Sequence, residues 1–331
     1  MSGSSALVDG YDLVIFDLDG VVYLGTEPVP GAVDAINRLR TGPHAVVYAT
    51  NNAARRPDEV AELLAGLGVA ATPDEVLTSP QAAAALLAER LPSGSPVLVV
   101  GTDAVATEVR AVGLTPVSSA EDKPAAVVQG YGPKVGWPEL AEACVAVRAG
   151  ALWVATNADR TLPSVRGPLP GNGALVAALA TALGREPDAV VGKPAPALFQ
   201  RAAQRAAARR PLVVGDRLDT DIEGATRAGM DSLLVLTGVS TAADVLAAPE
   251  HQRPTHLAED LAGLFTVDSG GSGWRVRRRG TALELAGDGT PIAALWALCE
   301  VAWAAGAPNT ITAGSPAATT ALRALRLPRP A

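Results

Sequence analysis

Two aspartates two residues apart follow an apolar segment of the chain. The segment Leu13–Phe16 has the composition of a buried strand, and it runs directly into Asp17, Leu18, Asp19 and Gly20. Alternate residues of a strand face the same side, so both carboxylates can reach one ligand. The carboxyl ends of parallel strands form the edge at which α/β proteins bind ligands. Aspartate and glycine are also common in turns, so this quartet alone leaves an ordinary turn as an equal alternative.

Polar residues follow three further apolar segments. Hydroxyl and amide groups suit the oxygens of a phosphoryl group, a lysine supplies a compact positive charge, and carboxylates bind metal ions. A solvated loop lysine and an aspartate that caps a helix are the alternatives for the single motifs. Because this combination is rare by chance, we predict one shared active site. The segments are Thr50-Asn51-Asn52 after Val46–Ala49, Gly192-Lys193-Pro194 after Val190-Val191, and Asp216, Asp219 and Asp221 after Pro211–Val214.

The four motifs resemble those of haloacid dehalogenase superfamily phosphatases. The residues that carry the resemblance are Asp17-Leu-Asp19-Gly-Val, Thr50-Asn-Asn, Gly192-Lys193-Pro and Gly215-Asp216-x-x-x-Thr220-Asp221. Other segments resemble the branch with a large α/β cap, which includes 4-nitrophenyl, pyridoxal phosphate, glycerol 3-phosphate and phosphoglycolate phosphatases. These segments are Pro28-Val-Pro-Gly31-Ala, Ala155-Thr-Asn157-Ala-Asp159, Pro170-Gly-Asn-Gly173 and Thr237-Gly-Val-Ser-Thr241. The resemblance covers about residues 10–265, and the chain departs from it at Ala53 and Ala54, where the branch often has a hydroxyl residue.

The two aspartates of the first motif have distinct expected roles. Phosphate monoesters are nearly inert in water, so an enzyme must supply an in-line nucleophile and protonate the departing alkoxide. We predict that Asp17 is the nucleophile and forms an aspartyl-phosphate that water then hydrolyses. Asp19 is expected to protonate the leaving oxygen and later to accept a proton from the water. The resemblance implies the same two roles.

The acidic strand ends predict a magnesium site. Mg²⁺ takes hard oxygen ligands and is usually held by one or two carboxylates together with substrate phosphate. We expect Asp17 and Asp216 to supply those carboxylates. The resemblance implies the backbone carbonyl of Asp19 as a third ligand, and it gives Asp221 the role of orienting bound water or the lysine.

The hydroxyl, amide and lysine motifs predict the phosphate-binding part of the site. Thr50, Asn51 and Lys193 are expected to hold the phosphoryl oxygens, and the lysine also lowers the repulsion between anionic substrate and anionic nucleophile. Asn52 is expected either to contact the substrate or to cap its turn.

Composition argues against other chemistries. The chain has only three histidines and two cysteines, His44, His251, His256, Cys144 and Cys299. Their spacing excludes a normal zinc or Cys-His site, and two lone cysteines fit a reducing, cytoplasmic compartment. The first ten residues lack the pattern of a signal peptide, and no apolar segment is long enough to span a bilayer. A net charge of -7 disfavours nonspecific nucleic-acid binding.

Alternating apolar strands and Ala-Leu-rich helices predict an α/β fold with a parallel sheet and helices on both faces. We expect a discontinuous Rossmann-like catalytic core, an inserted α/β cap domain and a small α+β C-terminal extension. The expected bounds are 1–81 and 188–265 for the core, 82–187 for the cap, and 266–331 for the extension. The core is expected to include the strand before Lys193 and helices over 32–40 and 57–67, and the cap to have strands over 97–100, 126–129 and 152–155.

The cap is expected to close over the site and to recognise the leaving group. The candidate residues for this recognition are Asn157, Asp159, Arg160 and Asn172. The turn around Asn172 is explained equally well as the start of a helix over 174–183, and Asp159 with Arg160 as a solvated pair.

The C-terminal extension lies outside the resemblance. Ser269–Gly273 has the composition of a flexible linker, and a hairpin of Arg275–Arg279 with Thr281–Leu285 and a helix from Pro291 are expected after it. Arg277-x-x-Gly280-x-Ala282 resembles the pyrophosphate loop of acetyltransferases, but in those proteins a helix starts at once, whereas a strand is predicted here. We therefore favour a packing or regulatory appendage.

Three functions are compatible with these residues. The first is a phosphatase of a small phosphate ester, best glycerol 3-phosphate, with phosphoglycolate, pyridoxal phosphate and nucleotides as alternatives; a closed cap disfavours phosphoproteins. The second is a phosphomutase or dehalogenase, although a dehalogenase does not need Asp19 to protonate an alkoxide. The third is a metabolite-sensing module without activity, against which the intact catalytic positions argue. The oligomeric state stays open, a homo-oligomer included.

Overall fold

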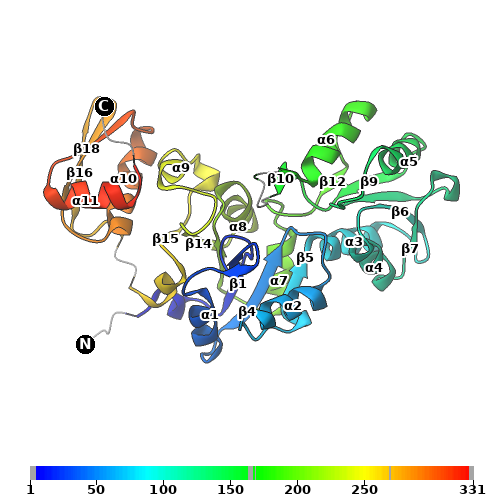
Figure 1. Ribbon diagram of the computed structural model, residues 1–331, viewed down its shortest axis with the longest axis horizontal. Helices are drawn as coiled ribbons and strands as arrows, with labels where there is room; N and C mark the ends of the chain where they lie inside the picture. Colours follow the sequence, from blue (N-terminus) through cyan, green and yellow to red (C-terminus); the bar gives the residue numbers. More distant parts are fainter. Residues whose placement is uncertain (1–4, 163–166, 168, 268–269, 328–331) are drawn as a thin grey trace. The chain divides into compact units, whose positions relative to one another are not determined.

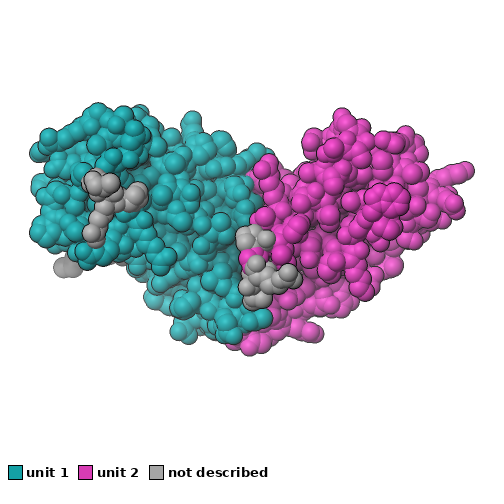
Figure 2. Space-filling view, turned by 45° about the horizontal axis from the view of Figure 1, so that its top comes forward, with its two compact units in different colours: residues 1–46, 206–331 teal, residues 47–205 magenta. Residues whose placement is uncertain are grey.

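The computed structural model describes residues 5–162, 167, 169–267 and 270–327 of the chain. The chain divides into two compact units, coloured separately in Figure 2. Unit 1 comprises residues 1–46 and 206–331, and unit 2 comprises residues 47–205.

A six-stranded sheet has the order β15-β14-β13-β1-β4-β5. Its strands are β1 (Leu13–Phe16), β4 (Ala45–Thr50), β5 (Val76–Thr78), β13 (Pro211–Gly215), β14 (Asp231–Val235) and β15 (His256–Ala258). The pairs β1 with β13, β13 with β14, β14 with β15, and β4 with β5 are all parallel. Every residue of β1 is fully buried, which is typical of a parallel strand covered on both faces. The predicted α/β class with a parallel sheet is confirmed.

Outside the sheet strands and the C-terminal extension, unit 1 contains short helices and one hairpin. They are η1 (Leu7–Gly10), the hairpin β2 (Tyr23–Leu24) and β3 (Glu27–Pro28), α1 (Ala32–Arg40), η4 (Leu218–Ile222), α8 (Glu223–Ala228), α9 (Ala242–Leu246), η5 (Glu250–Gln252) and η6 (Leu261–Phe265). The bounds of α1 are those expected from the sequence. Its buried residues include Ile36 and Leu39, three positions apart on one face, and basic residues lie in its last turn, where they favour the helix dipole.

Unit 2 contains a five-stranded sheet of order β12-β9-β8-β6-β7, with all pairs parallel. The strands are β6 (Pro96–Val100), β7 (Thr115–Val117), β8 (Ala126–Gln129), β9 (Leu152–Ala155) and β12 (Ala189–Val190). The remaining elements are α2 (Pro57–Gly66), η2 (Pro73–Glu75), α3 (Ser79–Arg90), α4 (Asp103–Ala111), η3 (Ala120–Asp122), α5 (Trp137–Arg148), the hairpin β10 (Thr161–Leu162) and β11 (Leu169–Pro170), α6 (Asn172–Leu183) and α7 (Ala197–Arg205).

The three strands expected in the cap are therefore found, but the strand before Lys193 lies elsewhere than expected. We expected it in the catalytic core, whereas β12 pairs with β9 at the edge of the five-stranded sheet. The physical reason is its length, because a two-residue apolar segment does not encode which sheet it joins.

Packing on the five-stranded sheet is dominated by α5 and α6. Trp153 of β9 is fully buried between small and aliphatic residues of both helices, including Ala146 and Leu179. Figure 1 shows these two helices on one side of the sheet and α3 with α4 on the other. Helices on both faces are the reason that β8 is buried at all of its residues.

The C-terminal extension folds into the predicted hairpin and helix. Strands β16 (Trp274–Arg279) and β17 (Ala282–Gly287) are antiparallel, and β18 (Thr310–Ala313) pairs with β17 in parallel. Helix α10 (Pro291–Ala305) begins where the Thr290 hydroxyl accepts the N–H of Ala293, and α11 (Pro316–Ala324) follows β18. Ser269 of the expected linker lies outside the described residues.

The extension shares one apolar core with the rest of unit 1. Leu283, Leu285 and Leu298 pack in the same cluster as Ile222 and Val245. Figure 1 shows α10 and α11 beside β16 and β18. Among the described residues, no helix combines the length and apolar character that crossing a membrane requires.

Candidate active site

Three carboxylates converge in unit 1. One oxygen from each of Asp17, Asp216 and Asp221 lies within 4.8 Å of the other two, and all three residues are buried. Asp17 follows β1, and Asp216 follows its neighbour β13. The structure therefore brings together the two predicted metal ligands and the predicted supporting aspartate.

The turn after β1 explains the glycine of the first motif. The N–H of Asp17 donates to the carbonyl of Val214 at 2.8 Å, so the β1–β13 ladder continues into the motif. Gly20 has φ +89°, and a Cβ there would lie 2.5 Å from Oδ2 of Asp216. Only glycine fits both the left-handed backbone and the close approach of the carboxylate. Asp19 is half-buried in this turn.

The loop after β14 holds Asp216 in place. The N–H of Val239 donates to Oδ2 of Asp216 at 2.6 Å, and a Cβ on Gly238 would lie 2.0 Å from the same oxygen. The hydroxyl of Thr237 donates to the carbonyl of Gly20 at 2.6 Å. From the sequence, this segment was expected only to resemble the capped branch. Its role in supporting the acidic cluster was missed, because no local pattern indicates which carboxylate a loop N–H will reach.

The third acidic motif separates into inward and outward residues. Asp221 is fully buried, and its Oδ2 accepts the N–H of Arg217 at 3.1 Å. Asp219 is exposed and forms an ion pair with the guanidinium of Arg217 at 2.9 Å. Asp219 is therefore the member of the motif that faces solvent.

The donor set of the cluster fits a hard divalent cation. Buried carboxylates at this separation repel one another when ionised, so a cation between them is favourable. Carboxylate oxygens are the ligands that Mg²⁺ and Ca²⁺ prefer, whereas the softer histidine and cysteine ligands do not occur in this cluster.

In unit 2, the segment after β4 forms a tight polar turn. The buried Thr50 hydroxyl accepts the N–H of Asn52 at 3.0 Å, and Oδ1 of Asn52 accepts the N–H of Ala54 at 2.8 Å. The side-chain carbonyl oxygen of Asn52 thus caps the turn, which is one of the two roles expected for Asn52. Ala53 is buried, and its carbonyl accepts the hydroxyl of Thr102 at 3.0 Å.

Lys193 and Asn51 meet in unit 2 although they are 142 residues apart. Lys193 is 3% exposed, and its Nζ donates to the carbonyl of Ala49 at 3.2 Å. The Asn51 amide donates to the carbonyl of Lys193 at 3.0 Å and accepts the N–H of Lys193 at 2.8 Å. The predicted lysine and amide motifs are thus one connected group.

The cap candidates divide into buried and accessible residues. Asn157 and Asn172 are buried, and their amides donate to main-chain carbonyls, Asn157 to Asn51 at 2.7 Å and Asn172 to Asn157 at 2.9 Å. Asn172 is the first residue of α6, so the helix-start interpretation of its turn is confirmed. Asp159 is half-buried and accepts from the Asn51 amide at 3.2 Å, and Arg160 is exposed.

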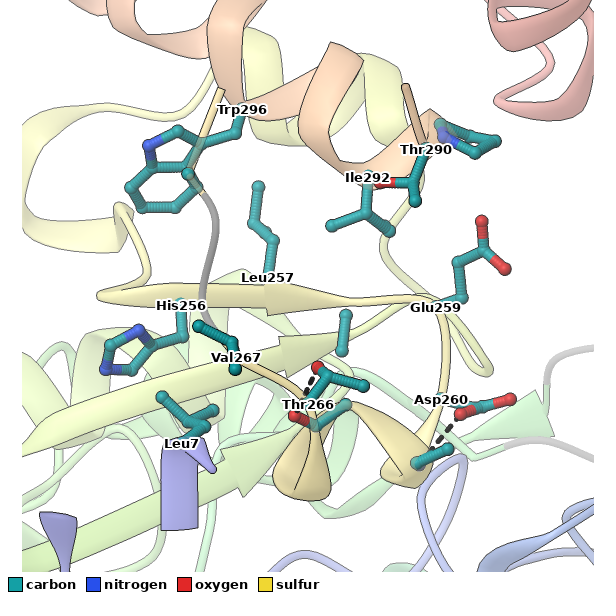
Figure 3. A pocket seen from close by; sticks show the side chains of 15 residues that line it. Leu7, His256, Leu257, Glu259, Asp260, Thr266, Val267, Thr290, Ile292 and Trp296 are labelled. Carbon is teal, nitrogen blue, oxygen red and sulfur yellow. Dashed lines mark hydrogen bonds between the residues drawn. The ribbon is translucent and has the colours of Figure 1, made fainter. Parts of the chain in front are cut away.

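A separate pocket of about 450 Å³ lies in unit 1 beside the C-terminal extension. Figure 3 shows Leu257, Ile292 and Trp296 on its walls, with His256 and Asp260 at its polar margins. None of the predicted site residues lines it. It is therefore a feature distinct from the acidic cluster.

Family models match three parts of the chain. Residues 14–115 match the haloacid dehalogenase-like hydrolase model, and residues 190–264 match a second, HAD-hydrolase-like model. Residues 272–327 match the model of the GCN5-related N-acetyltransferase like domain. The acetyltransferase likeness that we set aside is therefore supported by a family model, and the argument against it from the predicted strand was wrong, although strand β17 does follow Gly280.

Two curated relatives cover three quarters of the chain or more. It is 46% identical to D-glycerol 3-phosphate phosphatase of Mycobacterium tuberculosis, over 98% of this chain and 96% of that protein. It is 36% identical to acid sugar phosphatase of Staphylococcus aureus, over 76% of this chain and 95% of that protein.

Two of the solved structures that resemble this chain are also phosphatases. The crystal structure of glycerol phosphate phosphatase from M. tuberculosis in complex with magnesium superposes with a TM-score of 0.92 at 46% identity, covering 98% of this chain and all of that one. The 4-nitrophenylphosphatase of Thermotoga maritima superposes with a TM-score of 0.73 at 30% identity, covering 78% and 97%.

The carboxyl ends of parallel strands, where these carboxylates lie, are where α/β proteins bind their ligands. With these matches, the chain belongs to the haloacid dehalogenase superfamily of hydrolases, in the branch of the capped phosphatases.

Proposed function

We propose that this phosphatase hydrolyses glycerol 3-phosphate to glycerol and inorganic phosphate. The observation that carries the substrate assignment is the 46% identity to D-glycerol 3-phosphate phosphatase over 98% of the chain. The convergence of Asp17, Asp216 and Asp221 supports the chemistry. Because acid sugar phosphatase is a more distant relative with lower coverage, a small polyol phosphate is favoured over a sugar phosphate.

Asp17 is proposed as the nucleophile. One of its carboxylate oxygens attacks phosphorus, an Asp17–phosphate bond forms, and the bond from phosphorus to the glycerol oxygen breaks. Asp19 donates its proton to the departing alkoxide. In the second step, water attacks the phosphorus of the aspartyl-phosphate while Asp19 accepts a proton from it, which releases phosphate and restores the Asp17 carboxylate.

A magnesium ion is proposed as the cofactor. The carboxylates of Asp17 and Asp216 and the backbone carbonyl of Asp19 would hold it, and Asp221 would support it from the same cluster. When bound, the ion neutralises charge on the phosphoryl oxygens and on the surrounding carboxylates. The fully buried position of Asp216, fixed by the N–H of Val239, supports a ligand that does not need to reorganise.

Thr50, Asn52 and Lys193 are proposed to contact the phosphoryl oxygens, and Asn51 belongs to the same group through its hydrogen bonds to Lys193. Burial of Lys193 strengthens the interaction of its ammonium group with a dianion, because few water molecules screen it. Among the four cap candidates, the exposed Arg160 and the half-buried Asp159 are better placed to contact a leaving group than Asn157 and Asn172, whose amides already donate to the main chain.

The proposed organisation has residues 1–81 and 188–265 as catalytic core, 82–187 as cap and 266–331 as extension, except that the strand β12 (Ala189–Val190) pairs within the sheet of the cap. A cytoplasmic enzyme is proposed, and the two free cysteines are consistent with that compartment. The partner is a small phosphate ester, and neither a nucleic acid nor a membrane is required.

The test is phosphate release from a panel of esters in the presence of Mg²⁺. The panel contains glycerol 3-phosphate, phosphoglycolate, pyridoxal 5′-phosphate, nucleotides and 4-nitrophenyl phosphate. The expected result is a dominant kcat/KM for glycerol 3-phosphate. A higher kcat/KM for another ester would reassign the substrate, and absence of turnover on all esters would favour a sensing module instead.

A further inference from the structure

Both N–H groups of the Asn51 side-chain amide already have hydrogen-bond acceptors within the protein. Its Nδ2 donates to the carbonyl of Lys193 at 3.0 Å and to both carboxylate oxygens of Asp159 at 3.2 Å. Its Oδ1 accepts the N–H of Lys193 at 2.8 Å. A carboxamide has two N–H donors and one carbonyl oxygen, so no N–H of this amide is left for a phosphoryl oxygen.

We propose that the Asn51 side chain is a positioning residue that clamps the main chain of Lys193, rather than a ligand of the phosphate. This inference deepens the proposed function and rests on it, because it takes Lys193 as the cation that holds the phosphoryl group. It also revises the role expected for Asn51 from the sequence.

The clamp has a physical purpose, because a lysine ammonium is a point charge on a flexible four-carbon stem. The position of Nζ is set only if the main chain that carries the stem is fixed. Lys193 lies just beyond the two-residue edge strand β12, and ladder-type pairing there ends with the N–H of Val191 on the carbonyl of Ala155. Beyond that point, the two hydrogen bonds from the Asn51 side chain hold the main chain of Lys193.

Gly192 is adapted to this contact. A Cβ at Gly192 would lie 2.6 Å from Oδ1 of Asn51 and 2.5 Å from the carbonyl of Thr156. A side chain there would push the lysine segment away from the amide. The glycine before the lysine is therefore explained by the close approach of Asn51.

Asn157 and Ser79, the first residue of α3, in turn hold the main chain of Asn51. The Asn157 amide donates to the carbonyl of Asn51 at 2.7 Å, and the hydroxyl of Ser79 donates to the same carbonyl at 2.9 Å. Both the main chain and the side chain of Asn51 are fixed, so its amide presents one orientation to Lys193. A preorganised support of this kind saves the cost of ordering the lysine when phosphate binds.

A double-mutant cycle on phosphate binding tests the clamp. The dissociation constant of inorganic phosphate is measured by calorimetry in the presence of Mg²⁺ for the full chain and for Asn51→Ala, Lys193→Ala and the double variant. A residue that acts through Lys193 has its effect only while Lys193 is present. We expect Asn51→Ala to weaken phosphate binding about tenfold in the parent and less than about twofold in the Lys193→Ala background.

Equal weakening in both backgrounds would overturn the clamp, since it would make Asn51 an independent phosphate ligand, while leaving the proposed function intact. Unchanged phosphate affinity in Lys193→Ala itself would refute the proposed role of Lys193 and the clamp together. The two failures are therefore distinguishable.

Two further variants keep the test sharp. Thr102→Ala removes the hydroxyl that donates to the carbonyl of Ala53 in the same segment, so it is the matched control and should leave phosphate affinity within about twofold. Thermal unfolding monitors the fold of every variant. If Asn51→Ala unfolds, Asn51→Ser takes its place in the cycle, because the serine hydroxyl is too short to bridge the main chain of Lys193. The same weakening of phosphate binding is then expected for Asn51→Ser.

Discussion

The indole N–H of Trp303 donates to the carbonyl of Val245 at 2.9 Å and joins α10 of the extension to α9. The guanidinium of Arg253 lies 5.4 Å from the centre of the Trp303 ring and donates to the Trp303 carbonyl at 3.3 Å. Apolar residues of the extension share a core with α9 and η4. The extension is thus built into unit 1, which supports the packing role favoured from its sequence.

This junction predicts a stability effect far from the acidic cluster. Trp303→Phe removes the hydrogen bond to Val245 and part of a half-buried ring, so we expect a loss of about 1–2 kcal/mol in the free energy of unfolding. Urea denaturation measures the change. Trp137→Phe is the control, because Trp137 is 82% exposed and its replacement should stay within about 0.5 kcal/mol. Equal effects of the two substitutions would show that the junction contributes nothing.

The loop beside Asp216 predicts a specific loss of metal affinity. In Gly238→Ala the new methyl group would overlap Oδ2 of Asp216, 2.0 Å away, so the carboxylate must move. We expect the Mg²⁺ concentration for half-maximal phosphate release to rise by about tenfold or more.

The control for this substitution is Gly66→Ala. A Cβ at Gly66, the last residue of α2, meets no atom within 4 Å, so its metal dependence should match that of the parent. A parent-like Mg²⁺ requirement in Gly238→Ala would mean that Asp216 does not hold the ion.

The acidic residues predict contrasting effects of isosteric amides. Asp17→Asn removes the proposed nucleophile and should lower kcat by at least about a thousandfold. Asp219→Asn changes an exposed aspartate that pairs with Arg217 and lies three residues from Asp216 and two from Asp221. It should change kcat by less than about twofold. Comparable losses in both variants would argue against the assignment of Asp17.

Asp12 predicts a pH dependence of stability. The main-chain N–H of Arg209 donates to its carboxylate at 2.8 Å and that of Arg210 at 2.9 Å, and these hydrogen bonds, chiefly that of Arg209, lower the pKa of Asp12 below its usual 3.8. Because this pKa is lower in the folded state than in the unfolded state, the ionised carboxylate stabilises the fold at pH values above the unfolded-state pKa. The stabilisation is lost as the pH falls through the folded-state pKa.

Asp12→Asn should therefore lower the free energy of unfolding by about 1 kcal/mol at pH 7, a figure reduced for the exposure of the group. The difference between parent and variant should shrink below about pH 4. Urea denaturation at both pH values measures it. A difference that stays constant from pH 7 to pH 3 would exclude the ionised carboxylate as its source.

Local pattern was sufficient for most elements. Helix α1, the extension hairpin and the start of α10 were predicted because apolar spacing, turn residues and capping residues act within a few positions. The sheet that contains β12 was predicted wrongly, since a two-residue strand acquires its partner from long-range register.

The sequence by itself determined the chemistry, because strand ends followed by aspartates, amides and a lysine can be read from short-range order. Only the tertiary structure decided which two aspartates of the third motif turn inward and that the Asn51 amide is directed at the main chain of Lys193. The physical reason is that these contacts join residues far apart in the chain, and their geometry follows from how whole elements pack.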